Sequence, residues 1–176
     1  MAKQATPSKA NTSAPKQDRE VDKLFAQYAA YHQHPINRLL QKIFVPLFCF
    51  GLLGLVWATP FPHLAFLGRY AGYINWASLL IGIAIYYYYK LSPVLSYFIL
   101  FTVFGFSYGI ISLEKWEAAG GPKLWQVSLL IFAAALVGIS IGYVAEKKNP
   151  QLITRIKQLI IAPLYLWHLV VNKFIR

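Results

Sequence analysis

Polar side chains able to carry out chemistry gather in two short segments of this sequence, 31–37 and 142–150, each beside a long apolar run. The first segment holds His32 and His34, two residues apart, and the second holds Glu146 near the end of its apolar run. Imidazole and carboxylate groups together are common ligands of transition metals. By themselves, the two histidines are a weak signal of a metal site.

The same residues also have a purely structural interpretation. Two histidines at this spacing are a weak metal signal, because an imidazole at a membrane interface often hydrogen-bonds only to its neighbours. Glu146 can pair with Lys147 or Lys148, or extend to water at the membrane edge. His63 and His168 have no partner that the sequence identifies. The sequence contains no nucleophile elbow, phosphate-binding loop or paired-cysteine zinc motif.

The elements that position these residues are expected to be long apolar helices. The chain of 176 residues is 57% hydrophobic and 13% charged, whereas soluble domains carry roughly 25% charged residues. Between Ile43 and Leu113 the charged residues are Arg69 and Lys90 alone, and such uncharged runs are typical of membrane spans. The sequence therefore predicts an all-α, integral membrane bundle of about four transmembrane helices. The expected spans are 43–59, 73–89, 93–113 and 124–144.

A polar tail and a short helix are expected to precede the first span. Residues 1–20 predict a disordered tail, since they are polar and lack the apolar core of a signal peptide. Residues 21–31 predict an amphipathic interfacial helix. Pro35 ends this helix, and Asn37 is the expected cap of the next one.

Two further elements are expected in the second half of the chain. Residues 114–123 predict a polar loop between the last two spans. The segment 153–174 is apolar but carries several charges and a proline, which favours a helix lying at the interface over a fifth crossing. The whole of 21–176 is expected to form a single membrane domain.

The distribution of positive charge predicts the orientation of the bundle. Of the 17 Lys and Arg residues, all but Arg69, Lys115 and Lys123 lie on one side of the expected spans. Because positively charged flanks stay in the cytoplasm, both termini are expected there, in a bacterial inner membrane or an endoplasmic reticulum. This orientation places both polar segments on one face. The same flanks explain the net charge of +11, so nucleic acid is not an expected partner.

Two motifs in the sequence resemble those of a known family of small membrane proteins. They are Tyr31-His32-x-x-Pro35-x-Asn37 followed by Ile43-Phe44-Val45-Pro46, and Ile141-Gly142, Glu146, Lys148 and Pro150 followed by Ile161-Ala162-Pro163. The family is related to the fungal 2-hydroxy fatty acid dioxygenase, which acts in the conversion of phytosphingosine to odd-numbered fatty acids. The resemblance covers roughly residues 24–174.

The resemblance implies an activity and a set of site residues. The family's reaction uses Fe(II) and O2 to remove one carbon from a 2-hydroxy acyl chain, with histidines near the membrane edge as metal ligands. His32 and Glu146 are then the expected catalytic residues and metal ligands, and His34 is a further candidate ligand. The sequence departs from the family at Gln41 and Tyr143, where histidine is usual. The expected substrate-binding residues are Tyr31, Asn37, Arg38, Gln41, Tyr143 and Lys148.

Three functions from different classes fit these observations. The first is an Fe(II)-dependent dioxygenase that acts on a 2-hydroxy fatty acid. The second is a non-catalytic protein that holds a fatty acid or another membrane lipid, with Arg38, Lys42 or Lys148 near the carboxylate. The third is a membrane scaffold or homo-oligomer whose small residues permit close helix contact. Those small residues are Gly51, Gly54, Gly82, Gly105 and Gly138.

Overall fold

A computed structural model describes residues 19–62, 74–146 and 151–175 of the chain. Every regular element in these ranges is an α-helix, which confirms the predicted fold class. The helices are α1 (Glu20–Tyr31), α2 (Pro35–Trp57), α3 (Trp76–Leu91), α4 (Pro93–Ala118), α5 (Leu124–Ala145) and α6 (Leu152–Ile175). The disordered tail expected over 1–20 lies outside the described residues, apart from Arg19 and Glu20.

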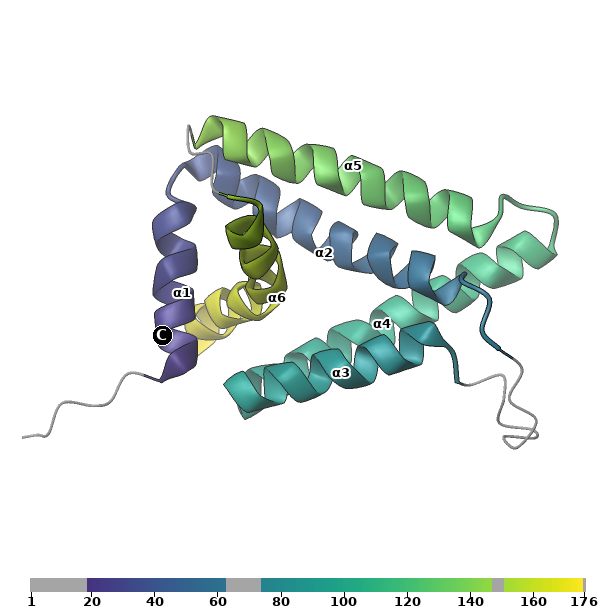
Figure 1. Cartoon of the computed structure of the whole chain (residues 1–176), viewed down its shortest axis with the longest axis horizontal. Coiled ribbons are helices and arrows are strands. Elements are labelled where there is room, and N and C mark those ends of the chain that lie inside the picture. Colours follow the sequence, from purple (N-terminus) through teal and green to yellow (C-terminus); the bar gives the residue numbers. More distant parts are fainter. Residues whose placement is uncertain (1–18, 63–73, 147–150, 176) are drawn as a thin grey trace, which may run out of the picture.

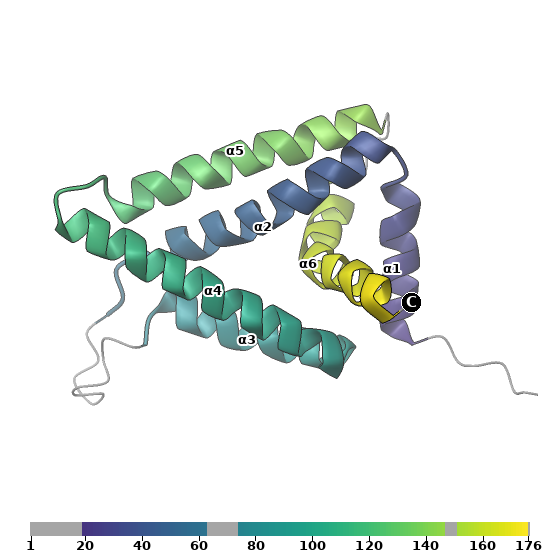
Figure 2. The ribbon, with the colours of Figure 1, turned by 180° about the vertical axis from the view of Figure 1, so that it is seen from behind.

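The described helices are arranged as a triangle (Figures 1 and 2). One side is the pair α2 and α5, which lie antiparallel along their length, and a second side is the antiparallel pair α3 and α4. The two pairs meet at one end and diverge toward the other, where α1 and α6 lie across the open side. The fold thus holds two helix pairs apart at an angle.

Buried apolar residues gather at the three corners of this triangle. Where the two pairs meet, they are Leu53, Ala77, Ile110 and Leu124. Where α1, α3, α4 and α6 meet, they are Val21, Phe25, Tyr88, Leu95, Ile99, Ile161 and Leu164. Where α1, α2, α5 and α6 meet, they are Tyr28, Val45, Ile139, Tyr143 and Ala162. Because the packing is concentrated at the corners, the middle of the triangle has room for a cavity.

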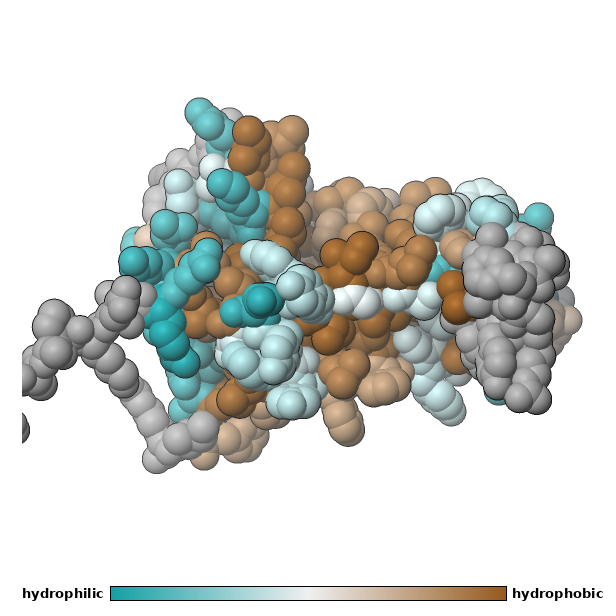
Figure 3. All heavy atoms as spheres, turned by 60° about the horizontal axis from the view of Figure 1, so that its bottom comes forward, coloured by the Kyte–Doolittle hydropathy of each residue, from teal (hydrophilic) through white to brown (hydrophobic). Residues whose placement is uncertain are grey.

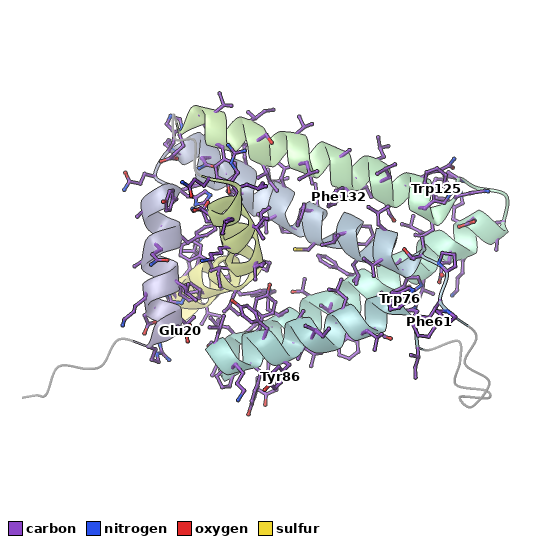
Figure 4. The ribbon with its side chains drawn as sticks, viewed as in Figure 1. Glu20, Phe61, Trp76, Tyr86, Trp125 and Phe132 are labelled. Atoms are coloured by element: carbon purple, nitrogen blue, oxygen red, sulfur yellow. The ribbon has the colours of Figure 1, made fainter. Side chains whose placement is uncertain are left out.

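Glycines permit the close contact between α2 and α5. A Cβ atom on Gly51 would lie 2.7 Å from the backbone nitrogen of Phe132, which Figure 4 shows on the side of α5 that faces α2. Gly82 and Gly105 differ, since a Cβ atom on either would meet nothing within 4 Å. Some of the glycines expected to permit close helix contact therefore do so between two helices of this chain. The other glycines in the α2–α5 contact are Gly54, Gly138 and Gly142.

The start of α2 differs from the prediction. The helix begins at Pro35, well before the expected start of the first span at residue 43. Its N-cap is His34, whose Nδ1 accepts a hydrogen bond from the backbone nitrogen of Ile36 at 3.3 Å. The prediction that Asn37 caps this helix was wrong, because proline is favoured at the first helical position and starts the helix two residues earlier. Asn37 lies inside the first turn.

The loop expected over 114–123 is also shorter than predicted, because α4 continues through Glu117. Both acidic side chains of this last turn have partners on neighbouring elements. Glu114 accepts a hydrogen bond from Nε1 of Trp57 at 3.0 Å, and Glu117 accepts one from the backbone nitrogen of Leu124 at 2.8 Å. These bonds hold the charged end of α4 in place, so the helix does not fray where its sequence becomes polar.

Three of the described helices, α2, α4 and α5, are long and apolar enough to cross a membrane. α3 corresponds to the expected span 73–89 and has 16 residues, fewer than the roughly 20 that a full crossing needs. α6 carries Arg155, Lys157 and Lys173 along its length, which suits an interfacial helix. Apolar side chains dominate the middle of the face in Figure 3, and hydrophilic ones gather at the end that holds α1. The chain is therefore an integral membrane protein.

Candidate functional site

Polar residues from four helices meet in the corner formed by α1, α2, α5 and α6. Segment 31–37 and the described part of segment 142–150 both contribute to it. The members of this polar cluster are Tyr28, His32, Asn37, Gln41, Tyr143 and Gln158, with Glu146 at its edge. Each of the first six is at most 7% exposed. Buried polar groups must be hydrogen-bonded to be tolerated, so the bonds they make decide what the cluster can do.

The carboxylate of Glu146 ties the end of α5 to the start of α2. Its Oε1 accepts a hydrogen bond from the backbone nitrogen of Gln33, and its Oε2 accepts one from the backbone nitrogen of His34, both at 2.9 Å. Oε2 also accepts a bond from Nδ2 of Asn37 at 3.1 Å. These donors lie at the N-terminus of α2, where backbone amides lack helical partners and the helix dipole favours an anion. Glu146 therefore caps α2 from another helix.

A series of side-chain hydrogen bonds leads from α1 through α2 to this cap. The hydroxyl of Tyr28 donates to Oε1 of Gln41 at 3.4 Å, and Nε2 of Gln41 donates to Oδ1 of Asn37 at 3.4 Å. Burial raises the pKa of Tyr28 well above its ordinary value, so its hydroxyl keeps its proton and acts as a donor. A Cβ atom on Gly142 would lie 2.5 Å from Oδ1 of Asn37. Asn37 and Gln41 are thus engaged with protein neighbours.

His32 is held in one orientation at the end of α1. Its Nδ1 lies 2.9 Å from the carbonyl oxygen of Tyr28, and because a carbonyl only accepts, Nδ1 carries the hydrogen. The imidazole stacks on the Tyr28 ring with 4.2 Å between centroids and lies 5.7 Å from the ring of Tyr143. Metal-bound histidines are commonly oriented by the same kind of bond. His32 therefore has the orientation of a ligand.

The last helix supplies part of the cluster that the sequence did not predict. The hydroxyl of Tyr143 donates to Oε1 of Gln158 at 3.1 Å, and the Arg155 guanidinium lies 5.2 Å from the centroid of the Tyr143 ring. Arg155 and Gln158 are three residues apart, so they lie on one face of α6. The signal available for Gln158 was weak: it is a polar residue within an apolar segment.

The donor atoms around His32 do not fit the Fe(II) that the family resemblance implies. A 2-His-1-carboxylate iron site needs two imidazoles and a carboxylate directed at one point. Nδ1 of His34 accepts the Ile36 amide, and the Glu146 oxygens accept three N–H groups. Gln41 and Tyr143 offer an amide and a phenol in place of imidazoles. In the part of the chain that the structure describes, no three His, Cys, Asp or Glu side chains form a group able to hold a metal.

Three of the predicted substrate-binding residues lie away from the cluster interior. Tyr31 is 36% exposed. Arg38 is also exposed, and its Nε donates to the carbonyl oxygen of His32 at 2.9 Å, which stabilises the link between α1 and α2. Lys148 lies outside the described residues. Roles for these three residues in substrate binding stay predictions.

An apolar cavity of about 1080 Å³ lies in the middle of the triangle, between α2, α3, α4 and α6. Figure 4 shows side chains of these helices reaching into this space. This volume slightly exceeds that of ordinary ligand pockets, which measure roughly 300–1,000 Å³. Most lining residues are aliphatic or aromatic, and the charged ones are Lys42 and Lys173. Both lysines are exposed, so they mark the rim of the cavity.

Two hydrogen bonds fasten α6 to the opposite walls of the cavity. The hydroxyl of Tyr88 on α3 donates to the carbonyl oxygen of Ile160 at 2.7 Å. The Nε1 of Trp167 donates to Oγ1 of Thr102 on α4 at 2.9 Å. These polar groups of the wall are therefore engaged with each other, and they join α6 to α3 and to α4 across the cavity.

One layer of side chains separates the cavity from the polar cluster. The residues of this layer line the cavity and also belong to, or pack against, the buried group that contains Tyr28 and Tyr143. They are Val45, Phe48, Cys49, Leu159 and Leu166. None of the polar-cluster residues defined above lines the cavity, so a molecule in the cavity does not reach His32.

The fold and these two features define a polytopic, all-helical membrane protein with a closed polar corner and a large apolar cavity. A family model described as Mpo1-like, 2-hydroxy-palmitic acid dioxygenase Mpo1-like, matches residues 19–174. The chain belongs to this family, as its two sequence motifs predicted. No curated protein and no solved structure matches the chain.

Proposed function

We propose that this family member binds a long-chain fatty acid in its apolar cavity and does not oxidise it through Fe(II). The observation that carries this proposal is the cavity of about 1080 Å³, whose lining is apolar except near Lys42 and Lys173 at the rim. An apolar interior whose charged lining residues are two exposed amines matches a molecule with an anionic end and a long hydrocarbon tail.

The source of affinity follows from the membrane environment. A tail that moves from the bilayer into the cavity is surrounded by hydrocarbon in both places. Its binding free energy therefore comes from packing contacts and not from removal of apolar surface from water. The charged headgroup then contributes most of the selectivity. The amines of Lys42 and Lys173 are exposed and attract a carboxylate at the rim while the tail fills the cavity. The charge distribution of the sequence supports a rim that faces the cytoplasm.

Two observations argue against iron-dependent oxidation at the family's expected site. The first is the donor set: Glu146 caps α2, the amide of Gln41 bonds to Tyr28 and Asn37, and Tyr143 is the ring near His32 from α5. The second is access, because the layer that includes Val45 separates the cavity from the polar cluster. The geometry therefore supports binding better than catalysis.

The cavity contains a natural reporter of occupancy. Cys49 is the only cysteine in the sequence, and it lines the cavity. In lipid nanodiscs, the rate at which a membrane-permeant maleimide labels Cys49 is measured with increasing palmitic acid. We expect saturable protection from labelling, with methyl palmitate protecting less because it lacks the charge. Replacing both rim lysines, Lys42→Gln with Lys173→Gln, is expected to weaken protection by about fivefold, as for an exposed ion pair.

Two controls make this experiment decisive. Lys90→Gln removes an amine that does not line the cavity, so it should leave protection unchanged. Labelling that no fatty acid slows would overturn the proposed binding. Metal analysis of protein expressed with iron tests the other half: stoichiometric iron in the unaltered protein, lost in His32→Ala, would favour the dioxygenase over this proposal.

A further inference from the structure

A second pocket lies at the end of the molecule where the two helix pairs meet. Its volume is about 470 Å³, and it is lined by the end of α2 and the residues that follow it, the residues just before α3, the last turns of α4 and the start of α5. It shares no lining residue with the apolar cavity. Carboxylates and aromatic rings line this pocket together, so its chemistry differs from that of the cavity.

The charged residues that line the pocket are both acidic. Glu114 and Glu117 are three residues apart and lie on one face of α4 near its end. Oε1 of Glu114 accepts a hydrogen bond from Nε1 of Trp57, and Oε2 of Glu117 accepts one from the backbone nitrogen of Leu124. The second oxygen of each accepts no hydrogen bond from a described residue. Each carboxylate therefore keeps one oxygen for a further donor or cation.

No cation in the part of the chain that the structure describes pairs with these carboxylates. The salt bridge found there joins Arg19 and Asp22, at the start of α1. Lys115 and Lys123 are close in sequence, but neither forms a salt bridge with a pocket carboxylate and neither lines the pocket. The pocket thus carries an excess of negative charge, to which a cationic ligand is complementary.

The aromatic rings that line the pocket are Trp57, Phe61 and Trp125. The indole of Trp57 is oriented by its bond to the carboxylate on α4. Phe61 contacts Trp76 edge-on with 5.1 Å between centroids, and Nε1 of Trp76 donates to the carbonyl oxygen of Pro60 at 3.1 Å. Figure 4 shows Phe61, Trp76 and Trp125 at the same end of the molecule. The faces of such rings attract cations, and most strongly those of tryptophan.

We propose that this pocket binds an organic ammonium ion, whose alkyl groups contact the aromatic rings while its charge lies beside Glu114 and Glu117. The rings favour an alkylated ammonium over a metal ion, because a metal ion needs several oxygen ligands in place of its water. The pocket lies at the ends of three apolar helices, α2, α4 and α5, at the depth of lipid headgroups. A free solute such as choline and the headgroup of a phospholipid offer the same ammonium group.

The experiment measures equilibrium binding of radiolabelled choline to the protein in maltoside micelles, which are neutral and contain no ammonium group. We expect saturable binding. Dimethylbutanol, the uncharged carbon analogue of choline, should compete about thirtyfold less well than unlabelled choline, because it keeps the shape and lacks the charge. In the double variant Glu114→Gln with Glu117→Gln, choline affinity should fall about tenfold, as for two exposed ion pairs. Glutamine keeps an oxygen that accepts the bonds from Trp57 and Leu124.

Variants of one ring and of a distant carboxylate complete the test. Trp125→Leu should weaken choline binding about threefold, and Trp125→Phe should restore most of the affinity, since it returns an aromatic face. Glu20→Gln removes a carboxylate at the other end of the molecule (Figure 4) and should leave the affinity unchanged. Equal competition by choline and dimethylbutanol, or an unaltered affinity in the double glutamine variant, would overturn the proposal.

Phospholipids added to the micelles separate the two sources of the ammonium group. Displacement of choline by phosphatidylcholine, but not by phosphatidylglycerol, supports a lipid headgroup as the ligand. Displacement by neither lipid supports a free solute. The absence of choline binding to the folded protein would overturn the proposal and would leave fatty acid binding untouched, because the two sites share no residue.

Discussion

The polar cluster and the apolar cavity share α2 and α6 as neighbouring walls, yet they are built in opposite ways. In the cluster, side chains from four helices bond to one another, and a glycine at position 142 brings α5 against Asn37. In the cavity, apolar side chains line an open space, and the walls are joined by two hydrogen bonds. The difference indicates that the cluster contributes to stability, whereas the cavity is available for a ligand. Substitutions that add or remove atoms in each region test this division.

The largest effect on folding is expected for Gly142→Val. The added side chain has no room, since its Cβ alone would lie 2.5 Å from Oδ1 of Asn37. Overpacking at such a site costs about 3 kcal/mol of unfolding free energy, measured by thermal unfolding in detergent micelles. Gly82→Val adds the same side chain where nothing lies within 4 Å and should cost far less. Equal losses in the two variants would contradict the close packing of the cluster.

The next largest effect is expected for Glu146→Ala. The substitution leaves the backbone amides of Gln33 and His34 without the carboxylate that caps α2. Charged hydrogen bonds of this kind contribute about 2 kcal/mol together after competition with water, measured in the same unfolding assay. Glu20→Ala removes an exposed carboxylate from α1 and should change the unfolding free energy little. A Glu146→Ala protein as stable as the unaltered one would contradict the role of this carboxylate in capping α2.

A smaller effect is expected for Tyr28→Phe, which removes one neutral hydrogen bond of 3.4 Å to Gln41 and keeps the ring. The expected loss is about 1 kcal/mol, because a buried amide oxygen loses its donor. Tyr108→Phe is the matched control, since Tyr108 is 76% exposed on α4. If both variants unfold alike, the bond series in the cluster does not contribute to stability.

The smallest effect on folding is expected in the cavity. Leu52 lines it and is 36% exposed, so Leu52→Trp has space for the larger ring and should change the unfolding free energy by less than about 0.5 kcal/mol. The same change should weaken palmitic acid binding roughly tenfold, because the indole occupies the ligand's volume. Leu130→Trp, on an exposed position of α5, should alter neither quantity. A large loss of unfolding free energy in Leu52→Trp with unchanged palmitic acid binding would contradict the view that the cavity serves a ligand and not stability.

Much of this fold could be predicted from the sequence, because its main signals are local. Uncharged apolar runs identify spans wherever they lie, and the motifs around His32 and Glu146 identify the family over most of the chain. The errors also have local causes. Asn37 has the residue type of a helix cap, but Pro35 starts the helix earlier and turns Asn37 inward, where it bonds to Glu146.

The cavity and the role of the cap could not be predicted in the same way. The cavity results from the angle between two helix pairs, which depends on contacts at all three corners and has no signature in a single segment. For this reason the sequence did not predict that Lys173 lines the same cavity as Lys42. Glu146 was predicted as a metal ligand from its type, whereas its backbone partners at Gln33 and His34 emerge only when α5 lies against α2.

The pairing of α2 with α5 across an intervening hairpin has a consequence for the biogenesis of the protein. When α2 leaves the ribosome and enters the bilayer, Asn37 lacks its acceptor Glu146 at the end of α5, which follows only after α3 and α4. The nascent chain therefore carries an amide-bearing helix in lipid during synthesis of the next two helices. A membrane insertase that shelters polar helices until their partners arrive is expected to speed maturation, and Gly142→Val should prolong this dependence.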